Sequence, residues 1–428
     1  MTLNETNIDR QDMVLASTIC KSIFDGTHES PKRRGSGFKL VTSRHIKGNK
    51  VLTEDAYFIN EEDYREINKR SRLQIGDVLF TMIGTVGEVC RITEEPDFAI
   101  KNIGVFRPAE LSDSVWIYYY LLSPEGRKNI EEAKRGTTQQ FIGLKELREF
   151  PIHFPHDSFY RRKQLKILEL IDEKIESNNS LSKTLEDIAQ TIFKSWFIDF
   201  DPVKAKMAGE KPEGMDDATV ALFPDSLVES ALGMIPKDWE VSDLDSISSV
   251  KYGAPFASKL FNTTKMGQPL IRIRDLKKQS ISTWSPEKHP KGFLVTGGEL
   301  LIGMDGEFNP TIWFGEDALV NQRICKIEPK EFVSNFFLYF TLVPIMRKIE
   351  HGSTGSTVIH LGKTDIDAIK VPIPSREILT AFKSLVEPLL KQIVALNIQV
   401  RILQEVRDAL LPRLISGELQ IPEEMLAS

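Results

Sequence analysis

One internal repeat limits the folds open to this 428-residue chain more than any other feature. Residues 76–84 read GDVLFTMIG, and residues 298–306, which lie 222 positions later, read GELLIGMDG. An apolar segment follows each copy and ends in an asparagine, Asn102 in the first half and Asn321 in the second. Such landmarks, repeated in one order, predict two related units rather than a single core.

A loop rich in glycine, threonine and serine follows in each half, at residues 136–140 and 352–357. Each loop runs through a leucine, Leu144 or Leu361, into an exit that contains proline. Four landmarks in the same order and at a nearly constant offset are improbable by chance. The chain is therefore interpreted as a duplication.

The repeated segments predict mixed α and β structure. Residues 78–80 and 300–302 are expected to form short buried strands after a turn that contains glycine. The glycine that ends each copy predicts a backbone conformation closed to other residues. Aromatic and apolar residues cluster at positions 114–122 and 332–342, where short helices are expected.

A long helix is predicted after each duplicated unit, because apolar residues there alternate steps of three and four, the spacing of a coiled-coil seam. The nine seam positions of the first helix recur 218 residues later in the same register. Those of the first helix are Leu168, Ile171, Ile175, Asn178, Ser182, Leu185, Ala189, Ile192 and Trp196. Those of the second are Val386, Leu389, Ile393, Leu396, Val400, Leu403, Arg407, Leu410 and Leu414. Because Pro388 falls in the first turns of the second helix, we expect a kink or a late start there.

These features divide the chain into five parts, of which residues 1–155 are here named the first head and residues 238–375 the second head. The first helix takes residues 156–200, a connector rich in proline and glycine takes residues 201–237, and the second helix takes residues 376–420. The expected fold is α+β, with two duplicated mixed α/β heads separated by two long antiparallel coiled-coil helices about a pseudo-twofold axis. Short helical pieces are expected in the connector. A helix of about 33 residues is roughly 50 Å long, enough to separate two heads by more than one DNA turn of about 34 to 36 Å.

The net charge of −6 does not by itself suggest a nucleic-acid partner, but the charges are unevenly distributed. Residues 28–51 hold seven Lys or Arg against one acid, and residues 270–292 hold six against two. The distribution of charge matters more than the total for nucleic-acid binding. Such a cluster is nevertheless more often a solvated face than a DNA site, so charge alone does not decide the function.

Several segments resemble a known family. Residues 171–178 and 191–203 are similar to the central conserved helix, and its exit, of the specificity subunit of type I restriction–modification systems. Residues 253–258 with 269–276 resemble the entry of one class of target-recognition domain, and residues 25–28 resemble the entry of another. The resemblance covers nearly the whole chain, and the unlike entries suggest that the two heads read unlike targets.

The sequence also departs from the family pattern. The Pro-x-x-Trp opening of the second head, Pro236 to Trp239, has no counterpart in the first head. The Glu-Gln pair usual at the helix entry is missing, and residues 161–164 and 376–378 stand in its place. These departures affect the expected start of the helices.

The resemblance implies a non-catalytic recognition subunit that binds double-stranded DNA at a bipartite, asymmetric target. It further implies assembly with two methylation subunits through the helices and with motor-nuclease subunits, which carry out adenine methylation and restriction. Those partners would use S-adenosylmethionine, ATP and magnesium, whereas this chain is expected to hold no cofactor and no metal. No signal peptide or membrane span is evident, and the three cysteines are far apart, so we expect a cytoplasmic protein.

Cations that contact phosphates supply affinity, and Arg, Gln or Asn on base edges supply sequence discrimination. The candidate DNA contacts of the first head are Arg33, Arg34, Arg44, Lys47, Arg135, Thr137, Thr138, Gln139 and Gln140. Those of the second head are Lys259, Arg272, Arg274, Lys277, Ser353, Thr354, Ser356, Thr357, His360 and Lys363. The Gly-Thr/Ser loops are the preferred recognition loops; the alternative is a solvent loop that caps the next helix.

Aromatic residues at the exit of the first helix are candidates for partner binding, with core packing against a head as the alternative. They are Phe193, Trp196, Phe197 and Phe200. Arg407, which stands alone on an aliphatic seam, is expected to face a partner or to extend its charge outward to solvent.

Two other function classes are compatible with a duplicated chain of this kind. A scaffold could bind proteins rather than DNA through its duplicated heads, and a self-sufficient nuclease or methyltransferase would need motifs of its own. Gly362-Lys363-Thr364 ends like a P-loop, but Thr357 stands where the earlier glycine is required. The missing motifs favour recognition over catalysis.

Overall fold

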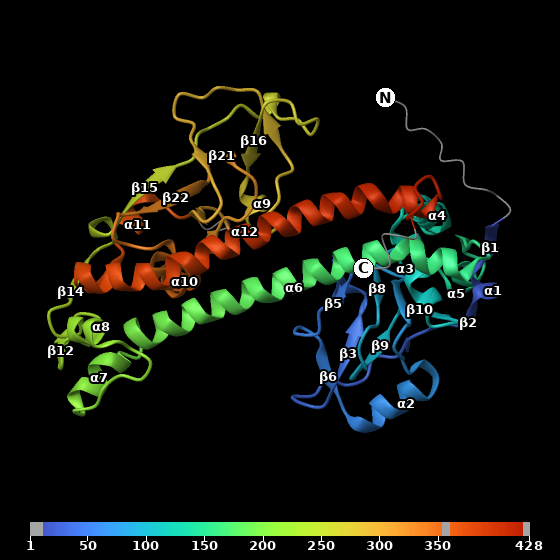
Figure 1. The fold of residues 1–428 in the computed structure, drawn as a ribbon, viewed down its shortest axis with the longest axis horizontal. Helices are drawn as coiled ribbons and strands as arrows, with labels where there is room; N and C mark the ends of the chain where they lie inside the picture. Colours follow the sequence, from blue (N-terminus) through green and yellow to red (C-terminus); the bar gives the residue numbers. More distant parts are fainter. Residues whose placement is uncertain (1–11, 353–359, 423–428) are drawn as a thin grey trace. The chain divides into compact units, whose positions relative to one another are not determined.

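The computed structural model describes residues 12–352 and 360–422, and the chain forms two compact units (Figure 1). Unit 1 comprises the chain up to Glu173 together with the segment from Leu403 onward, and unit 2 comprises Lys174–Ile402. Each of the two long helices contributes one part to each unit. Each unit therefore contains one head and a section of both helices.

The first head is built on a four-stranded antiparallel sheet of order β2-β10-β7-β8. Its strands are β2 (Cys20–Asp25), β7 (Val78–Thr81), β8 (Val89–Arg91) and β10 (Ile103–Pro108). All four residues of β7 are buried, as the apolar run predicts. Helix α3 (Asp113–Leu122) contributes Trp116 and Tyr120 to the core that contains Phe80 and Phe106 of the sheet.

A second sheet of order β6-β3-β9 completes the first head. Its strands are β3 (Phe38–Thr42), β6 (Tyr57–Ile59) and β9 (Phe98–Lys101), of which β3 and β9 run parallel. Smaller elements are β1 (Met13–Leu15), α1 (Ala16–Ile19), η2 (Ser43–His45), β4 (Ile46–Lys47), β5 (Lys50–Val51), α2 (Glu61–Ser71), α4 (Pro124–Ala133), α5 (Leu144–Arg148) and β11 (Pro151–His153). Helix α2 begins where the Asn60 side chain accepts a hydrogen bond from the Asp63 amide (2.7 Å).

The second head repeats this topology. A sheet of order β15-β22-β19-β20 corresponds to the four-stranded sheet of the first head, and β16 runs parallel to β21 as β3 does to β9. Its elements are β14 (Glu240–Asp243), η3 (Leu244–Ser246), β15 (Ser248–Tyr252), η4 (Ser258–Leu260), β16 (Gln268–Ile271), α9 (Ile273–Leu276), β17 (Trp284–Ser285), β18 (Leu294–Val295), β19 (Leu300–Gly303), β20 (Pro310–Ile312), β21 (Ala318–Val320), β22 (Ile324–Pro329), α10 (Asn335–Gly352), α11 (Lys363–Asp367) and β23 (Lys370–Ile373). The duplication is confirmed. Gly84 and Gly306 have φ of 82° and 76°, as expected of the glycines that end the repeats.

In each head the backbone passes close to a glycine, although the nearest carbonyls are neighbouring rather than equivalent ones, so the correspondence comes from the strand pairing. A Cβ on Gly26 would lie 2.3 Å from the Ile100 carbonyl oxygen, and one on Gly253 would lie 2.1 Å from that of Asn321. Only glycine fits such an approach. The parallel bridges Thr27–Lys101 and Ala254–Asn321 then place Asn321 at the position of Lys101. The sequence-based correspondence of Asn321 with Asn102 is therefore wrong by one residue.

The leucine landmark also needs correction. The Ile142 amide donates to the Met82 carbonyl (3.0 Å), and the Leu361 amide donates to the Met304 carbonyl (2.8 Å). The counterpart of Leu361 is thus Ile142, and Leu144 is instead the first residue of α5.

The two long helices, α6 (Ser158–Phe197) and α12 (Arg376–Ile415), have 40 residues each and run antiparallel. In unit 2, Asn178 Nδ2 donates to Gln399 Oε1 (3.1 Å), while Trp196 meets Phe382. In unit 1, Arg407 Nη1 donates to Asp172 Oδ1 (2.9 Å).

The predicted seam is confirmed, because each of its eighteen positions is buried or half-buried. Arg407 neither faces outward to solvent nor needs a partner protein, since it pairs with Asp172 of the facing helix. Of the two alternatives expected at Pro388, a kink or a late start, the late start is wrong, because α12 begins at Arg376 and continues through the proline. Burial of the seam offsets the one backbone hydrogen bond that Pro388 removes. Within the described ranges, no helix is long and apolar enough to cross a membrane.

The connector in unit 2 contains the short helices α7 (Asp201–Met207) and α8 (Asp217–Leu222), as expected. It also contains an antiparallel hairpin of β12 (Leu227–Ser230) and β13 (Gly233–Pro236), which the sequence did not predict. The hairpin directly precedes the second head, in which Trp239 is buried.

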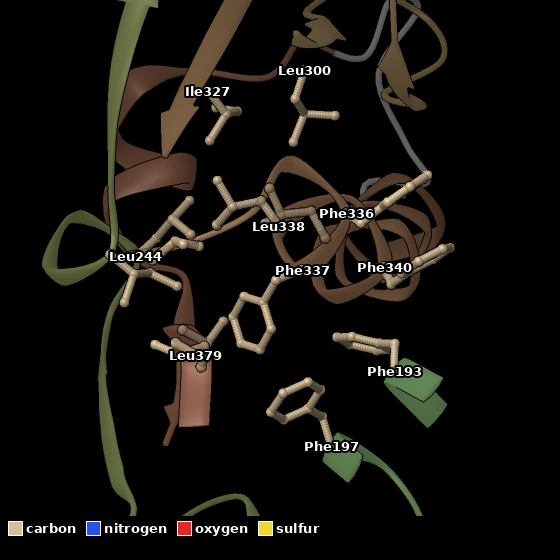
Figure 2. Packing of buried hydrophobic residues seen from close by; sticks show 14 of the residues in the cluster. Phe193, Phe197, Leu244, Leu300, Ile327, Phe336, Phe337, Leu338, Phe340 and Leu379 are labelled. Carbon is tan, nitrogen blue, oxygen red and sulfur yellow. The ribbon is translucent and has the colours of Figure 1, made fainter. Parts of the chain in front are cut away.

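The exit of α6 is part of the core of unit 2 (Figure 2). Phe193, Trp196 and Phe197 are each 5% exposed and Phe200 is half-buried. Figure 2 shows Phe193 and Phe197 directed toward Phe337 and Phe340 of α10. Phe193, Trp196 and Phe197, which were predicted to bind a partner protein, are therefore not available as a docking surface, because the second head, the connector and α12 cover them. Phe200, the fourth predicted residue, packs its half-buried ring against Trp239.

Candidate nucleic-acid interface

A basic turn occurs at the same place in both heads. It follows the strand that runs parallel to β9 in the first head and to β21 in the second. In the first head, η2 follows β3 and carries Arg44, and in the second, α9 follows β16 and carries Arg274. Val41 pairs with Ile100 and Ile271 pairs with Val320, so the two turns hold equivalent places in the sheets.

Each basic turn is closed by a side chain that accepts a hydrogen bond from the backbone. His45 Nδ1 accepts from the Thr42 amide (2.8 Å), and Asp275 Oδ2 accepts from the Arg272 amide (3.0 Å). Arg44 and Arg274 are exposed, as are Lys47 and Lys277, which lie three residues further along. Each head thus presents an arginine and a lysine from a fixed turn.

The polar loop of the first head, residues 136–140, is closed at its base by backbone pairing. Arg135 and Phe141 exchange two hydrogen bonds of 2.9 Å, and Ile83 bridges to Phe141. Arg135 also pairs with Glu146 (2.7 Å). The loop residues Thr137, Thr138, Gln139 and Gln140 are exposed.

The loop of the second head has the same attachment, since Asp305 bridges to His360 as Ile83 does to Phe141. Ser353, Thr354, Ser356 and Thr357 lie outside the described residues. His360 and the exposed Lys363 mark the end of this loop, and Gly362 caps α11 by donating its amide to Asp365 Oδ2 (2.8 Å). The Gly-Lys-Thr sequence is therefore the start of a short helix.

Three segments converge at one end of each head. They are the base of the polar loop, the connection from β9 to β10 or from β21 to β22, and the basic turn. In the first head, Ser43 Oγ of the turn donates to the Asn102 carbonyl (3.3 Å), and Ile103 beside Asn102 pairs with Thr81 at the end of β7. In the second head, a hollow of about 340 Å³ is lined by Arg274 and Lys277 of the turn and by Asp305 of the loop base. The predicted contacts Arg44, Arg135, Arg274, Lys277 and His360 therefore belong to converging segments.

Other predicted contacts have separate surroundings. Arg33 lies over the Tyr57 ring (5.0 Å), and the Arg34 amide donates to Phe58 (2.9 Å), so both follow the outer strand β6. Lys259 is exposed in η4, and Arg272 is half-buried over the Phe261 ring (5.5 Å). These four residues lie away from the loop base. Their positions fit a contact at the edge of the site, or a structural role, better than a central contact.

Sequence reasoning missed Arg323, which follows the crossover strand β21 in the second head. Its Nε lies 3.3 Å from Asp305 Oδ2, and its Nη1 lies 3.4 Å from His360 Nδ1. The residue lies outside both basic clusters, so charge density did not reveal it. Its position two residues after Asn321 was the available signal.

The three cysteines, Cys20, Cys90 and Cys325, are free and buried. Burial raises the pKa of the Cys90 thiol to about 11 and of the Cys20 and Cys325 thiols to about 12, so these thiols stay protonated at neutral pH. In residues 12–352 and 360–422, no group of three or more His, Cys, Asp or Glu is placed to hold a metal ion.

The basic turn of the first head is expected to weaken in mild acid. Burial, and next the charge of Arg44, lower the pKa of His45 from its ordinary value of 6.5. The unfolded chain then takes up a proton more readily than the folded head, so the stability contributed by neutral His45 is fully present above pH 6.5 and is lost as the pH falls through the folded-state pKa. Hydrogen exchange at the Thr42 amide between pH 7.5 and 5.5, corrected for the intrinsic rate, is expected to show falling protection.

The control is His45→Asn, whose side-chain oxygen can accept the Thr42 amide without titrating in this range. The variant is expected to show a flatter pH dependence than the native chain. Equal slopes in the two proteins would contradict the role assigned to His45.

Comparison with known proteins gives the family. The model of the type I restriction modification DNA specificity domain matches residues 22–187 and 236–400, one copy over each half of the chain. The specificity subunit of the type I restriction enzyme MjaIX from Methanocaldococcus jannaschii is 27% identical over 400 residues, which are 88% of this chain and 83% of that protein. The specificity subunit of EcoBI from Escherichia coli is 35% identical over 190 residues, but the match spans only 43% of this chain and 40% of that relative.

The fold agrees with the family. The crystal structure of a type I restriction-modification S subunit from M. genitalium superimposes with a TM-score of 0.54 at 16% identity, covering 97% of this chain and 98% of that one. Two mixed α and β heads with two long antiparallel helices define a class of duplicated recognition proteins. The chain belongs to the type I restriction–modification DNA specificity family.

Proposed function

We propose that this chain is the DNA-sequence-reading subunit of a type I restriction–modification complex, in which each head reads one half of a split, asymmetric target. The observation that carries the proposal is the convergence, in both heads, of an exposed Arg-Lys turn with the base of a polar loop. Cations can neutralise phosphates there, while loop side chains reach base edges. Because the two loops differ in sequence, two different half-sites are expected.

In this proposal the chain recognises the DNA sequence and its partner subunits carry out the catalysis. Two methylation subunits would bring S-adenosylmethionine, and motor-nuclease subunits would bring ATP and magnesium. Adenine methylation and restriction would then occur in the cytoplasm at the sites that this chain selects. The family membership supports the assembly.

The experiment is DNA binding by the chain co-expressed with the methylation subunits of its host. Affinity for duplex DNA is expected to fall steeply between 50 and 200 mM salt, by a factor on the order of 10³ if six phosphates are contacted. Duplex binding that does not change with salt would contradict the proposal and favour a protein-binding scaffold.

A further inference from the structure

In the second head, Arg323 stands at the crossover between β21 and β22 in an uncommon backbone conformation. Its φ is 74°, a value that few residues other than glycine adopt. The conformation is held from both sides, since the Arg323 carbonyl accepts from the Met304 amide (2.8 Å) and β22 begins at the next residue. Such conformations persist where the surrounding structure fixes them, and they cluster at binding sites.

The Arg323 side chain is fixed as well. Asp305 Oδ2 lies 3.3 Å from Arg323 Nε, and Asp305 Oδ1 lies 2.7 Å from His360 Nδ1. The same carboxylate thus joins the arginine to His360, which follows the loop of residues 352–357 in the sequence. A guanidinium has five N–H donors, and the side chain of Arg323 is 53% exposed, so donors remain for a ligand.

We infer that Arg323 reads a guanine in the half-site of the second head, with Asp305 as its positioning residue; this rests on the proposed function. Arginine binds guanine by donating two parallel hydrogen bonds to O6 and N7 in the major groove. Pairing with a carboxylate through Nε lowers the entropy that the side chain loses on binding. Arg274 and Lys277 line the same hollow as Asp305 and supply charge for the adjacent phosphates.

A base contact by Arg323 would differ from a phosphate contact in what its loss changes. A phosphate contact changes affinity at all sequences, whereas a base contact changes one position of the motif. Lysine keeps the charge of arginine but not its two-pronged geometry. Arg323→Lys is therefore the decisive variant.

The test is methylation of a plasmid library of randomised targets by the complex with its host methylation subunits, read by single-molecule sequencing. The native complex is expected to methylate a split motif with a guanine in one half. Arg323→Lys and Arg323→Ala are expected to relax that single position on the order of 10- to 100-fold, and Asp305→Asn is expected to relax the same position less. The control is Lys330→Ala, which removes an exposed cation from the opposite end of β22 and should leave the motif unchanged.

An unchanged motif in Arg323→Lys overturns the inference, as does a uniform loss of methylation at every target by that variant. If Arg323→Ala abolishes methylation because the head is destabilised, Arg323→Lys still decides. A native complex that produces no split motif would instead contradict the proposed function, so the two failures are distinguishable.

Discussion

Replacing Phe382 by alanine is expected to destabilise unit 2 by about 3–5 kcal/mol, the range for a buried phenylalanine. Phe382 is fully buried, and its ring meets those of Phe193, Trp196 and Phe197 of the facing helix and of Phe337 in the second head. The substitution leaves a cavity where both helices and the head converge. Chemical unfolding followed by tryptophan fluorescence measures the loss.

The control is Leu385→Ala on the same helix, since Leu385 is 48% exposed. It is expected to change the free energy of unfolding by less than about 1 kcal/mol. Equal losses from the two substitutions would contradict the packing described for the exit of α6.

Replacing Asp113 by alanine is expected to cost about 3–5 kcal/mol in unit 1, because it leaves a buried guanidinium without its partner. Asp113 and Arg161 are 8% and 7% exposed, and Arg161 Nη2 donates to Asp113 Oδ1 (2.6 Å). Arg161 also lies over the Phe154 ring at 3.8 Å. The free energy of unfolding of unit 1 is the measured quantity.

An exposed ion pair in the same unit provides the comparison. Arg65 and Glu61 lie 2.6 Å apart on α2 and are 74% and 62% exposed. Glu61→Ala is expected to cost no more than about 0.5 kcal/mol, since water solvates both charges. If Asp113→Ala were as mild as Glu61→Ala, the Arg161 charge would have to be solvated in unit 1 rather than buried.

The coiled-coil seam and the Arg161–Asp113 pair show where sequence reasoning succeeds and where it fails. The seam was predictable because a coiled coil repeats one local pattern over nine layers, and each layer reports on the same contact. Arg161 was noticed only as a departure from the family pattern, because its partner Asp113 is 48 residues away. A buried ion pair between distant segments has no local signature.

The aromatic exit of α6 illustrates a second limit. Phe193, Trp196 and Phe197 have the composition of a docking surface, and interfaces and cores favour the same residue types. Only the positions of the second head, the connector and α12, which cover them, distinguish a docking surface from a core. Core packing was the alternative that the sequence left open, and it is the arrangement found in the structure.

The candidate interface was predictable in part. Arg44 and Arg274 were found by charge density, but their equivalence was not, because the turns lie 230 residues apart while the repeated strands lie 222 apart. A change in loop length between the copies hides such a correspondence from a constant offset. Arg323 was missed for a different reason. It is a single cation in the sequence, and only the fold brings Asp305 and His360 into contact with it.

The most direct measurement of the central claim is the adenine methylome of the host, read by single-molecule sequencing with and without this gene. One split, asymmetric motif is expected to be methylated in the intact strain and to disappear when the gene is deleted. Restoring the gene on a plasmid should restore the motif. An identical methylome in both strains, with the partner subunits present and active, would contradict the claim that this chain selects the sites.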